Sequence, residues 1–467
     1  MKGRLIVVLD VGKTLAKASL WTRDGKQLAK ASRPNVSQET GPYRALDAQG
    51  IENWLVDVLA GFKTFGRISA IVPVAHGAAA VVLRDGTLAL PPMDYEGKIP
   101  DPVRQSYLDQ RGQFSETGSP AMNDGLNLGL QLHYMEHLFP GLFEGDATIL
   151  PWAQYWAWRL SGVAASEVSG FGPHTDLWAP ADGKPSKLAE RRGWAKRFAP
   201  LRHASDALGQ LSLEWSSRTG LPADTMVLTG LHDSNAALHA ARAIPEIGDN
   251  DATIVSTGTW FVSMRSSAVD DSVLATLRED RGCVVNVDVN NRPVPTALFM
   301  GGREIGILTG EHGLRVDAPA EQMAITGEVG TCLDNDIMIL PCFVPDTGPF
   351  PKHRGRWINR PQNPFAAAAA VSLYAALMTD AALNLIGTRE TILIDGRFAN
   401  AEAFVRALAT LRAHDNIYVG SAENDLAVGA LRLVSLGLKS LNRLKRVDPL
   451  AVSLANYREQ WLERGIM

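Results

Sequence analysis

Two similar strand–tight turn–strand units, placed in different halves of the chain, constrain the fold more than any other feature. The first covers residues 5–21 and turns at Gly12-Lys13, after the apolar strand Leu5–Val11. The second covers residues 251–266 and turns at Thr257-Gly258. Repetition of one supersecondary unit within a chain is typical of internal duplication. We therefore predict a duplicated α/β fold.

The elements that follow each unit favour the same interpretation. They are a strand over 26–32, a helix over 53–65, an apolar strand over Ile68–Ala75 and, in the second half, a strand over Cys283–Val289. Strands next to a helix and a further strand indicate a mixed sheet. The polar segment Ile244–Asp251 is the best boundary between the halves, so we predict two domains, residues 1–246 and 247–467.

Composition excludes several classes of protein. Of 467 residues 46% are hydrophobic and 21% charged, with a formal charge of −4, which is typical of a soluble globular chain without a basic surface for nucleic acid or membrane. The 3 cysteines form no CxxC pair, which argues against a disulfide framework or a zinc site. The apolar runs over 5–9 and 366–378 are too short for a signal peptide and a membrane span. We predict a cytoplasmic protein with no nucleic-acid or membrane partner, and a homodimer is left open.

Several predicted strands end in a polar residue or a glycine, at Asp10, Gly77, Asp233, Thr259 and Gly396. In open α/β sheets ligands bind at the carboxyl ends of the strands. We therefore expect these positions to contribute to one ligand site.

The first turn, Gly12-Lys13-Thr14, resembles the end of a P-loop, but two features exclude that motif. Val7 stands where the first P-loop glycine belongs, and a strand instead of a helix follows the turn. A different phosphate turn fits, because its glycine lets backbone N–H groups approach phosphate. The hydroxyl of Thr14 and the ammonium of Lys13 or Lys17 can then contact anionic oxygens.

Asp10, at the end of the preceding strand, can hold Mg²⁺ through its hydration shell, because this ion prefers oxygen ligands and keeps its waters. A plain hairpin with a solvated carboxylate and ammonium is the alternative.

The second turn, Thr257-Gly258-Thr259, favours phosphate binding over a plain hairpin. Two hydroxyl-and-glycine turns at matching positions of duplicated halves can clasp one polyphosphate from both sides, so we assign both turns to phosphate binding.

These motifs resemble those of the FGGY carbohydrate kinases along nearly the whole chain. Lys13 departs from the resemblance, since the family more often has Thr, Ser or Ala there. Within the family the chain is most similar to rhamnulokinases. The residues that carry the resemblance are Asp10, Gly12, Thr14 and Lys17 in the first phosphate motif, Gly258 and Thr259 in the second, His76-Gly77, Leu160–Gly162, Asn127–Leu132, His232-Asp233, Ser256–Trp260, and Gly420, Glu423 and Gly429.

The resemblance implies an α/β fold of two ribonuclease H-like (actin-like ATPase) domains with a ligand cleft between them. It implies ATP and Mg²⁺ as cofactors and transfer of the γ-phosphate to a hydroxyl of a small ketose or polyol. A rhamnulose-like 6-deoxyketose or a ketopentose is the substrate expected first. Asp233 is implied as general base; an N-cap of the following helix is the alternative role, and the two roles are compatible.

The resemblance also assigns the remaining site residues. Arg397 departs from the glycine-rich nucleotide segment of the family, whereas Gly396 and Asn400 match it. Trp152 is assigned to sugar stacking, with core packing as the alternative. The sugar-binding residues are predicted to be His76, Gly77, Asn127, Trp152 and His232, and the nucleotide-binding residues Gly396, Arg397, Asn400 and Gly429.

Two other classes of function stay open at this point. A nucleotide- and sugar-binding regulator would use the same scaffold without catalysis. The presence of Asp10, Thr14, Thr259 and Asp233 together argues against it, because a catalytically inactive site does not require all four. A chaperone or filament former would need a peptide-binding region or an assembly surface, for which no additional domain is expected. The loop around His174 is interpreted as solvated, with substrate contact as the alternative.

Overall fold

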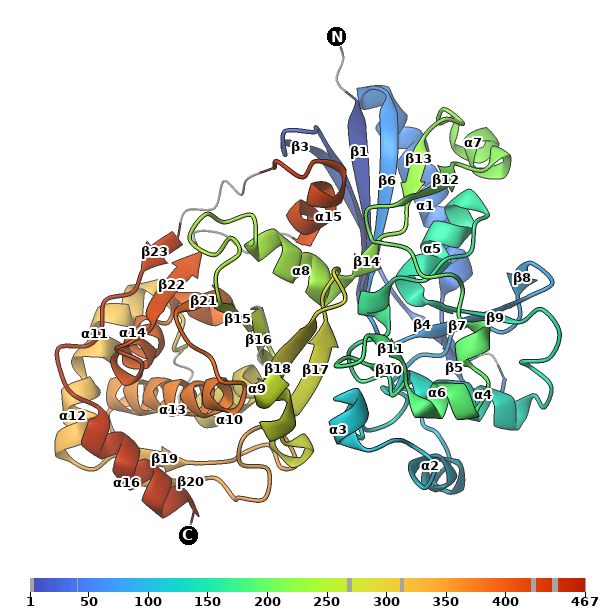
Figure 1. Ribbon diagram of the computed structural model, residues 1–467. Helices are drawn as coiled ribbons and strands as arrows, with labels where there is room; N and C mark the ends of the chain where they lie inside the picture. Colours follow the sequence, from blue (N-terminus) through green and yellow to red (C-terminus); the bar gives the residue numbers. More distant parts are fainter. Residues whose placement is uncertain are drawn as a thin grey trace. The chain divides into compact units, whose positions relative to one another are not determined.

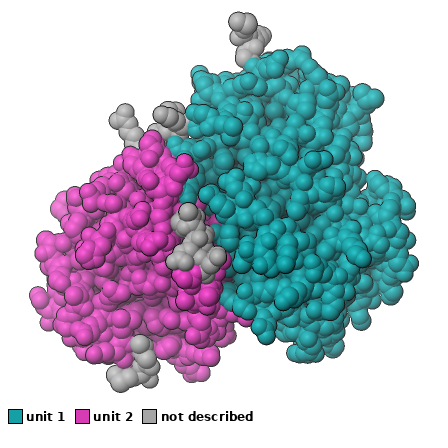
Figure 2. Space-filling view, viewed as in Figure 1, with its two compact units in different colours: residues 1–243, 285–293, 425–440 teal, residues 244–284, 294–424, 441–467 magenta. Residues whose placement is uncertain are grey.

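The structure is a computed structural model, and it describes residues 4–39, 41–266, 271–310, 315–420, 426–438 and 444–466. The chain divides into two compact units (Figure 2). Unit 1 comprises residues 1–243, 285–293 and 425–440, and unit 2 comprises residues 244–284, 294–424 and 441–467. The predicted division at 246/247 stays a prediction, and it did not include the two later segments that are grouped with unit 1.

Unit 1 is built on a mixed sheet with the strand order β12-β13-β6-β1-β2-β3 (Figure 1). β1 is antiparallel to β2 and parallel to β6, and the short β14 also pairs with β6. The strands are β1 (Leu5–Val11), β2 (Leu15–Trp21), β3 (Gln27–Pro34), β6 (Ile68–Ala75), β12 (Ala207–Gln210), β13 (Met226–Leu228) and β14 (Leu231–His232).

Alternating side chains bury both faces of β1, since successive residues of a strand point to opposite faces. Val7 belongs to a core with residues of α1 and α5, and Val8 belongs to another core with residues of α8 and α15. The helices of unit 1 are α1 (Ala48–Phe62), α2 (Asp101–Leu108), α3 (Phe114–Thr117), α4 (Leu128–Leu138), α5 (Trp152–Ser161), α6 (Lys187–Arg191), α7 (Leu213–Thr219), α8 (Asp233–Ala241) and α15 (Leu426–Val434).

A smaller layer of unit 1, with its own apolar core, contains α2, α4 and a three-stranded sheet of order β8-β7-β9. The remaining strands of unit 1 are β4 (Ser37–Glu39), β5 (Arg44–Leu46), β7 (Ala80–Arg84), β8 (Thr87–Leu88), β9 (Thr148–Pro151), β10 (Trp178–Ala179) and β11 (Lys184–Pro185).

Unit 2 repeats the central pattern of unit 1. β15 is antiparallel to β16 and parallel to β21, as β1 is to β2 and β6, so the predicted duplication is confirmed. The strands, in sheet order, are β17 (Cys283–Val287), β18 (Pro293–Phe299), β16 (Phe261–Ser266), β15 (Ala252–Thr257), β21 (Thr391–Gly396), β22 (Asn416–Gly420) and β23 (Leu444–Arg446).

The sequence missed one strand of this second copy. The predicted strand over Cys283–Val289 exists as β17, but β18 lies between it and β16. β18 is therefore the counterpart of β3, because each pairs with the second strand of its unit. The alternation of Pro293–Phe299 is weak, since five of its seven residues are buried.

Unit 2 also contains a two-stranded sheet and several helices. α13 is the one helix among the described residues that is long and apolar enough to cross a membrane, and 94% of its most apolar window is buried in the structure. The elements are α9 (Asp271–Thr276), α10 (Gly301–Thr309), α11 (Gln322–Gly327), α12 (Val329–Asp334), β19 (Met338–Leu340), β20 (Arg356–Ile358), α13 (Pro364–Leu385), α14 (Glu402–Leu411) and α16 (Ala455–Ile466).

Candidate functional site

The first predicted phosphate turn joins β1 to β2. The Gly12 N–H donates to the Leu15 carbonyl at 3.1 Å, and the Asn35 side-chain amide donates to the Gly12 carbonyl at 2.7 Å. At the end of β1 the Asp10 carboxylate is nearly buried and lies 3.4 Å from the Lys17 ammonium. The turn thus has a fixed backbone with one carboxylate and one ammonium beside it.

Thr14 is exposed on this turn, as a phosphate-binding hydroxyl requires, and the phosphate contact of Lys13 stays a prediction. Its ammonium contacts the Asp94 carboxylate and lies 3.3 Å from a carboxylate oxygen of Glu96. Asp94 was not identified from the sequence, because 81 residues separate it from Lys13.

The second predicted phosphate turn follows β15. The Gly258 N–H donates to the Trp260 carbonyl at 3.0 Å, and Gly258 and Thr259 are exposed. The Thr257 hydroxyl instead donates to the Asp395 carbonyl at 2.6 Å and accepts from the Phe398 N–H at 3.1 Å. Thr257 therefore ties this turn to the β21 loop, which leaves the backbone and Thr259 to face a ligand.

Asp233 is the first residue of α8, where the positive end of the helix favours its carboxylate. The carboxylate accepts from the Ser234 N–H at 2.6 Å and lies 3.1 Å from the Nε2 of His232. Burial raises the pKa of Asp233 to about 6, against the lowering by Ser234 and by the charge of Lys17. The side chain keeps 30% of its surface exposed, so the carboxylate is both desolvated and reachable.

Two histidines stand at the ends of the strands that lead to this carboxylate. Burial lowers the pKa of His76 to about 3 and that of His232 to about 4, so both rings are neutral. A Cβ on Gly77 would meet the His232 Nε2 at 2.7 Å, which explains the glycine at the end of β6. The structure therefore brings together Gly77, His76, His232 and Asp233, as expected from the strand ends.

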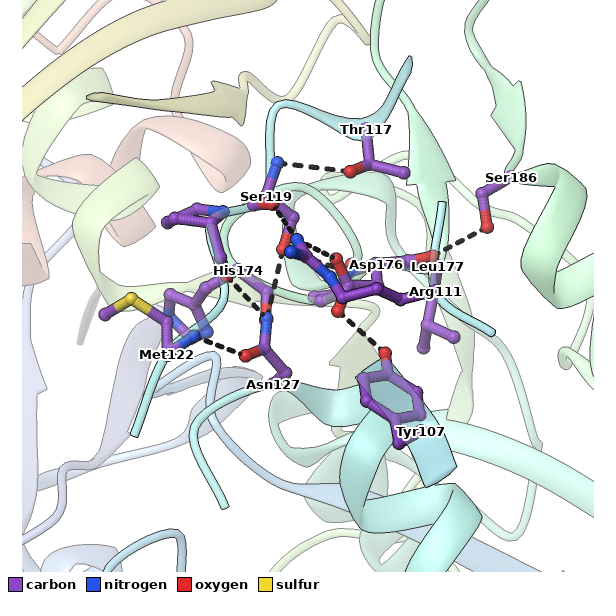
Figure 3. Close-up of polar contacts among 12 residues, drawn as sticks. Tyr107, Arg111, Thr117, Ser119, Met122, Asn127, His174, Asp176, Leu177 and Ser186 are labelled. Atoms are coloured by element: carbon purple, nitrogen blue, oxygen red, sulfur yellow. Dashed lines mark hydrogen bonds and ion pairs between the residues drawn. The ribbon is translucent and has the colours of Figure 1, made fainter. Parts of the chain in front are cut away.

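Asn127 is buried in front of α4, and its side-chain amide is used within the protein (Figure 3). Its Nδ2 donates to the Pro120 and His174 carbonyls, and its Oδ1 accepts from the Met122 N–H at 2.8 Å. The same network contains the buried Asp176, which pairs with Arg111 and accepts from Tyr107 (Figure 3). This arrangement gives Asn127 the role of holding two loops together.

The loop around His174 was interpreted as solvated, but Thr175 and Asp176 in it are buried, so that interpretation is wrong. His174 itself has a left-handed φ of 39°. This conformation is rare outside glycine and is typical of functional sites. Its Nδ1–H donates to the Leu126 carbonyl at 3.0 Å, so the lone pair of the neutral ring is at Nε2. Burial and the neighbouring His232 lower the pKa of His174 to about 4.

Trp152 begins α5 and is 1% exposed. Its ring stacks on Tyr155 with centroids 5.0 Å apart and meets Trp156 edge-on at 5.2 Å. These contacts are those of a core side chain, the alternative that the sequence left open, and His76 lies on the same ring at 6.4 Å.

The predicted nucleotide segment follows β21 in unit 2. Gly396 has a φ of 86°, and a Cβ there would meet the Thr257 carbonyl oxygen at 2.5 Å, so the turn needs glycine. The Arg397 guanidinium forms a two-pronged ion pair with Asp317, at 2.7 and 3.0 Å. Asn400 is exposed at the end of this segment.

Gly429 lies on α15 in unit 1, whereas Glu423, part of the same sequence motif, falls outside the described residues. A Cβ on Gly429 would meet the Ala236 carbonyl oxygen of α8 at 1.9 Å. The glycine therefore permits close packing of two helices, and its contact with nucleotide stays a prediction.

Asp10 was predicted to hold Mg²⁺. Among the described residues no group of three or more His, Cys, Asp or Glu side chains could hold a metal ion. A magnesium ion that takes most of its ligands from phosphate and water needs only one or two carboxylates. The nearly buried Asp10 carboxylate at the phosphate turn fits that requirement.

Comparison with known proteins agrees with this geometry. A solved carbohydrate kinase from Novosphingobium aromaticivorans is 50% identical, over 98% of this chain and 99% of that chain, with a TM-score of 0.95. Residues 249–442 match the family "Carbohydrate kinase FGGY, C-terminal domain". The chain belongs to the FGGY carbohydrate kinase family. The predicted family is thereby confirmed.

More distant relatives extend the comparison. L-fuculokinase of Escherichia coli (strain K12) is 26% identical over 293 residues, so the match spans 59% of this chain and 59% of that protein. A xylulose kinase from Rhodospirillum rubrum shares the fold, with a TM-score of 0.80 at 18% identity over 99% of this chain and 98% of that chain. The predicted fold class of two actin-like ATPase domains is confirmed for this member of the FGGY family.

Proposed function

We propose that the protein is a kinase that transfers the γ-phosphate of ATP to a hydroxyl of a ketose or polyol. The observation that carries the proposal is Asp233, a desolvated carboxylate with a pKa raised to about 6. Asp233 lies at the start of α8, next to the neutral His232, and this position suits a general base. Membership of the FGGY family supports the same reaction.

In this mechanism Asp233 accepts the proton of the attacking sugar hydroxyl. A base with a pKa of about 6 is ionised at neutral pH and still holds a proton well enough to assist the transfer. The Nε2 of neutral His232 lies 3.1 Å from the carboxylate and would restrain its position. Phosphoryl transfer otherwise depends on positioning and on neutralising charge, so one such base is sufficient.

The two glycine turns supply backbone N–H groups for the phosphates, together with the exposed hydroxyls of Thr14 and Thr259. Lys17, which lies beside Asp10, adds a positive charge to the first turn. Asp10 would hold Mg²⁺ through water, and the bound ion would neutralise charge on the phosphates. Gly396, Arg397, Asn400 and Gly429 remain the proposed nucleotide-side residues.

The sugar side is proposed to include His76, Gly77, Asn127, Trp152 and His232, with His174 added from the structure. Its histidines are neutral, which suits an uncharged polyol better than a sugar acid. Asn127 and Trp152 would act by holding the loops and His76 in place, since their own contacts are to protein. A rhamnulose-like 6-deoxyketose or a ketopentose is the substrate to test first.

The cytosol is the proposed site of action. All three cysteines, Cys283, Cys332 and Cys342, are free and buried, as expected for a protein of a reducing compartment.

The test is ADP release with Mg·ATP across a panel of ketoses, aldoses and polyols, with Asp233→Asn beside the unmodified protein. We expect sugar-dependent turnover that the substitution lowers by about 10²–10⁴-fold. Asp101→Asn is the matched control, because Asp101 is also the first residue of a helix but is exposed. Absence of any sugar response, with Mg·ADP still bound, would favour the non-catalytic regulator instead.

A further inference from the structure

The Lys13 ammonium lies among three oxygen atoms of protein side chains. It contacts the Asp94 carboxylate, and it lies 3.3 Å from a carboxylate oxygen of Glu96 and 3.5 Å from the Ser37 hydroxyl. A lysine ammonium has three donors and no more. These contacts direct the ammonium of Lys13 toward Ser37, Asp94 and Glu96.

The partner of Lys13 is built to receive it. Asp94 is fully buried, and its second carboxylate oxygen accepts from Ser37 and lies 3.0 Å from the Arg44 guanidinium. Burial would raise the pKa of Asp94, but the hydrogen bonds from Lys13 and Ser37 lower it. A buried carboxylate needs such pairing, so the contact with Lys13 is part of the folded state. We call Lys13, Ser37, Arg44, Asp94 and Glu96 the Lys13 clamp.

Between the two acidic residues of the clamp lies Tyr95, which faces the sugar side. The Lys13 ammonium lies over the Tyr95 ring, 5.0 Å from its centroid. The ring meets His76 edge-on at 5.8 Å. Burial raises the pKa of Tyr95 to about 12, and the charges of Glu96, Asp94 and Asp233 add to the effect, so its hydroxyl stays protonated. A cation over an aromatic face restrains the orientation of that ring.

We propose that Lys13 is a positioning residue for the acceptor sugar and not a phosphate ligand. Its ammonium fastens residues 94–96 to the first turn and orients Tyr95 beside His76. The proposal rests on the proposed function and deepens it. It also gives a physical meaning to the position at which this chain departs from the FGGY pattern, since Thr, Ser or Ala could not reach Asp94.

The test compares Lys13→Thr with Asp94→Asn and with the double variant, after the unmodified protein has shown turnover of an acceptor in the panel. Two readouts are needed, the dissociation constant of Mg·ADP from calorimetry and the KM for the acceptor. We expect each single variant to raise the acceptor KM by tenfold or more, with Mg·ADP affinity within twofold of the unmodified protein. The double variant should be no worse than either single variant, because both remove one clamp.

Lys17→Ala is the reference for a phosphate-side lysine, and it should weaken Mg·ADP. A loss of Mg·ADP affinity in Lys13→Thr, with Asp94→Asn unaffected, would overturn the proposal and leave the kinase intact. So would an unchanged acceptor KM in both variants. The double variant leaves no unpaired charge between these two positions. The same two measurements can therefore be made on it if a single variant fails to fold.

Discussion

The turn after β1 and the turn after β15 share a backbone but differ in what their side chains contact. In each, a glycine N–H donates to a carbonyl two or three residues further on, at Gly258 and Gly12 respectively. The first turn is fastened through Lys13 to the acidic residues Asp94 and Glu96. The second is fastened through Thr257 to the loop after β21. Duplication thus preserved the turn, whereas the side chains connect the two copies to different parts of the protein.

We expect the largest effect from pH, which should change the turnover of the sugar. The proposed base, Asp233, lies on the proposed sugar side. Asp233 must be ionised to accept a proton, and its pKa is raised to about 6. We expect kcat/KM for the sugar to be constant well above pH 6 and to fall tenfold for each pH unit below it. A pH–rate profile measured with Mg·ATP saturating tests this. A profile that stays level down to pH 5 would contradict the assignment of Asp233.

We expect the second-largest effect from Gly302→Ala, a substitution that disturbs only the second turn. A Cβ on Gly302 of α10 would meet the Gly258 carbonyl oxygen at 2.0 Å, so Gly302→Ala must displace the turn. We expect Mg·ADP affinity to fall by about tenfold and the free energy of unfolding to fall by about 1–3 kcal/mol. Gly306→Ala, on the same helix with nothing within 4 Å, is the control and should leave affinity unchanged.

The corresponding change on the sugar side is Gly77→Ala. The new Cβ would lie 2.7 Å from the His232 Nε2 and push the ring away from Asp233. We expect kcat/KM for the sugar to fall by roughly tenfold, since misplacement near the reacting groups is costly, while Mg·ADP binding is unchanged. Gly61→Ala, where nothing lies within 4 Å, is the matched control. Equal losses in sugar turnover and in Mg·ADP binding would contradict the proposal that Gly77 acts on the sugar side only.

The smallest effect is expected from Thr257→Val. This substitution removes a hydroxyl that makes two hydrogen bonds and keeps the shape of the side chain. The free energy of unfolding should fall by about 1–3 kcal/mol, with a loss of Mg·ADP affinity of a few-fold at most. Urea unfolding and calorimetry measure the two quantities. A much larger loss of affinity would show that the hydroxyl itself contacts phosphate.

The sequence predicted those features that depend on residues close together in the chain. The bounds of β1 and β6 match the prediction, and Asp233 lies at the junction of strand and helix as expected. Such features follow from local alternation, turn chemistry and strand ends.

Contacts that depend on distant partners were missed. Lys13 was assigned to phosphate because Asp94 and Tyr95, its actual neighbours, carry no local signal that points to residue 13. Trp152 looked equally suited to a sugar and to a core, and only its stacking on Tyr155 separates the two. The role of Asn127 depends on loops near residues 120 and 174, which the chain brings together only when folded.

The helix α15 has a consequence for biosynthesis. It completes the apolar core beside α8, yet it stands near the end of the chain, and Gly429 sits directly against the α8 backbone. While the ribosome is still adding residues 244–425, this side of α8 has no α15 to cover it. The emerging polypeptide therefore exposes this apolar surface until residues 426–434 have been added, and a fragment cut at residue 246 would lack the helix that covers it.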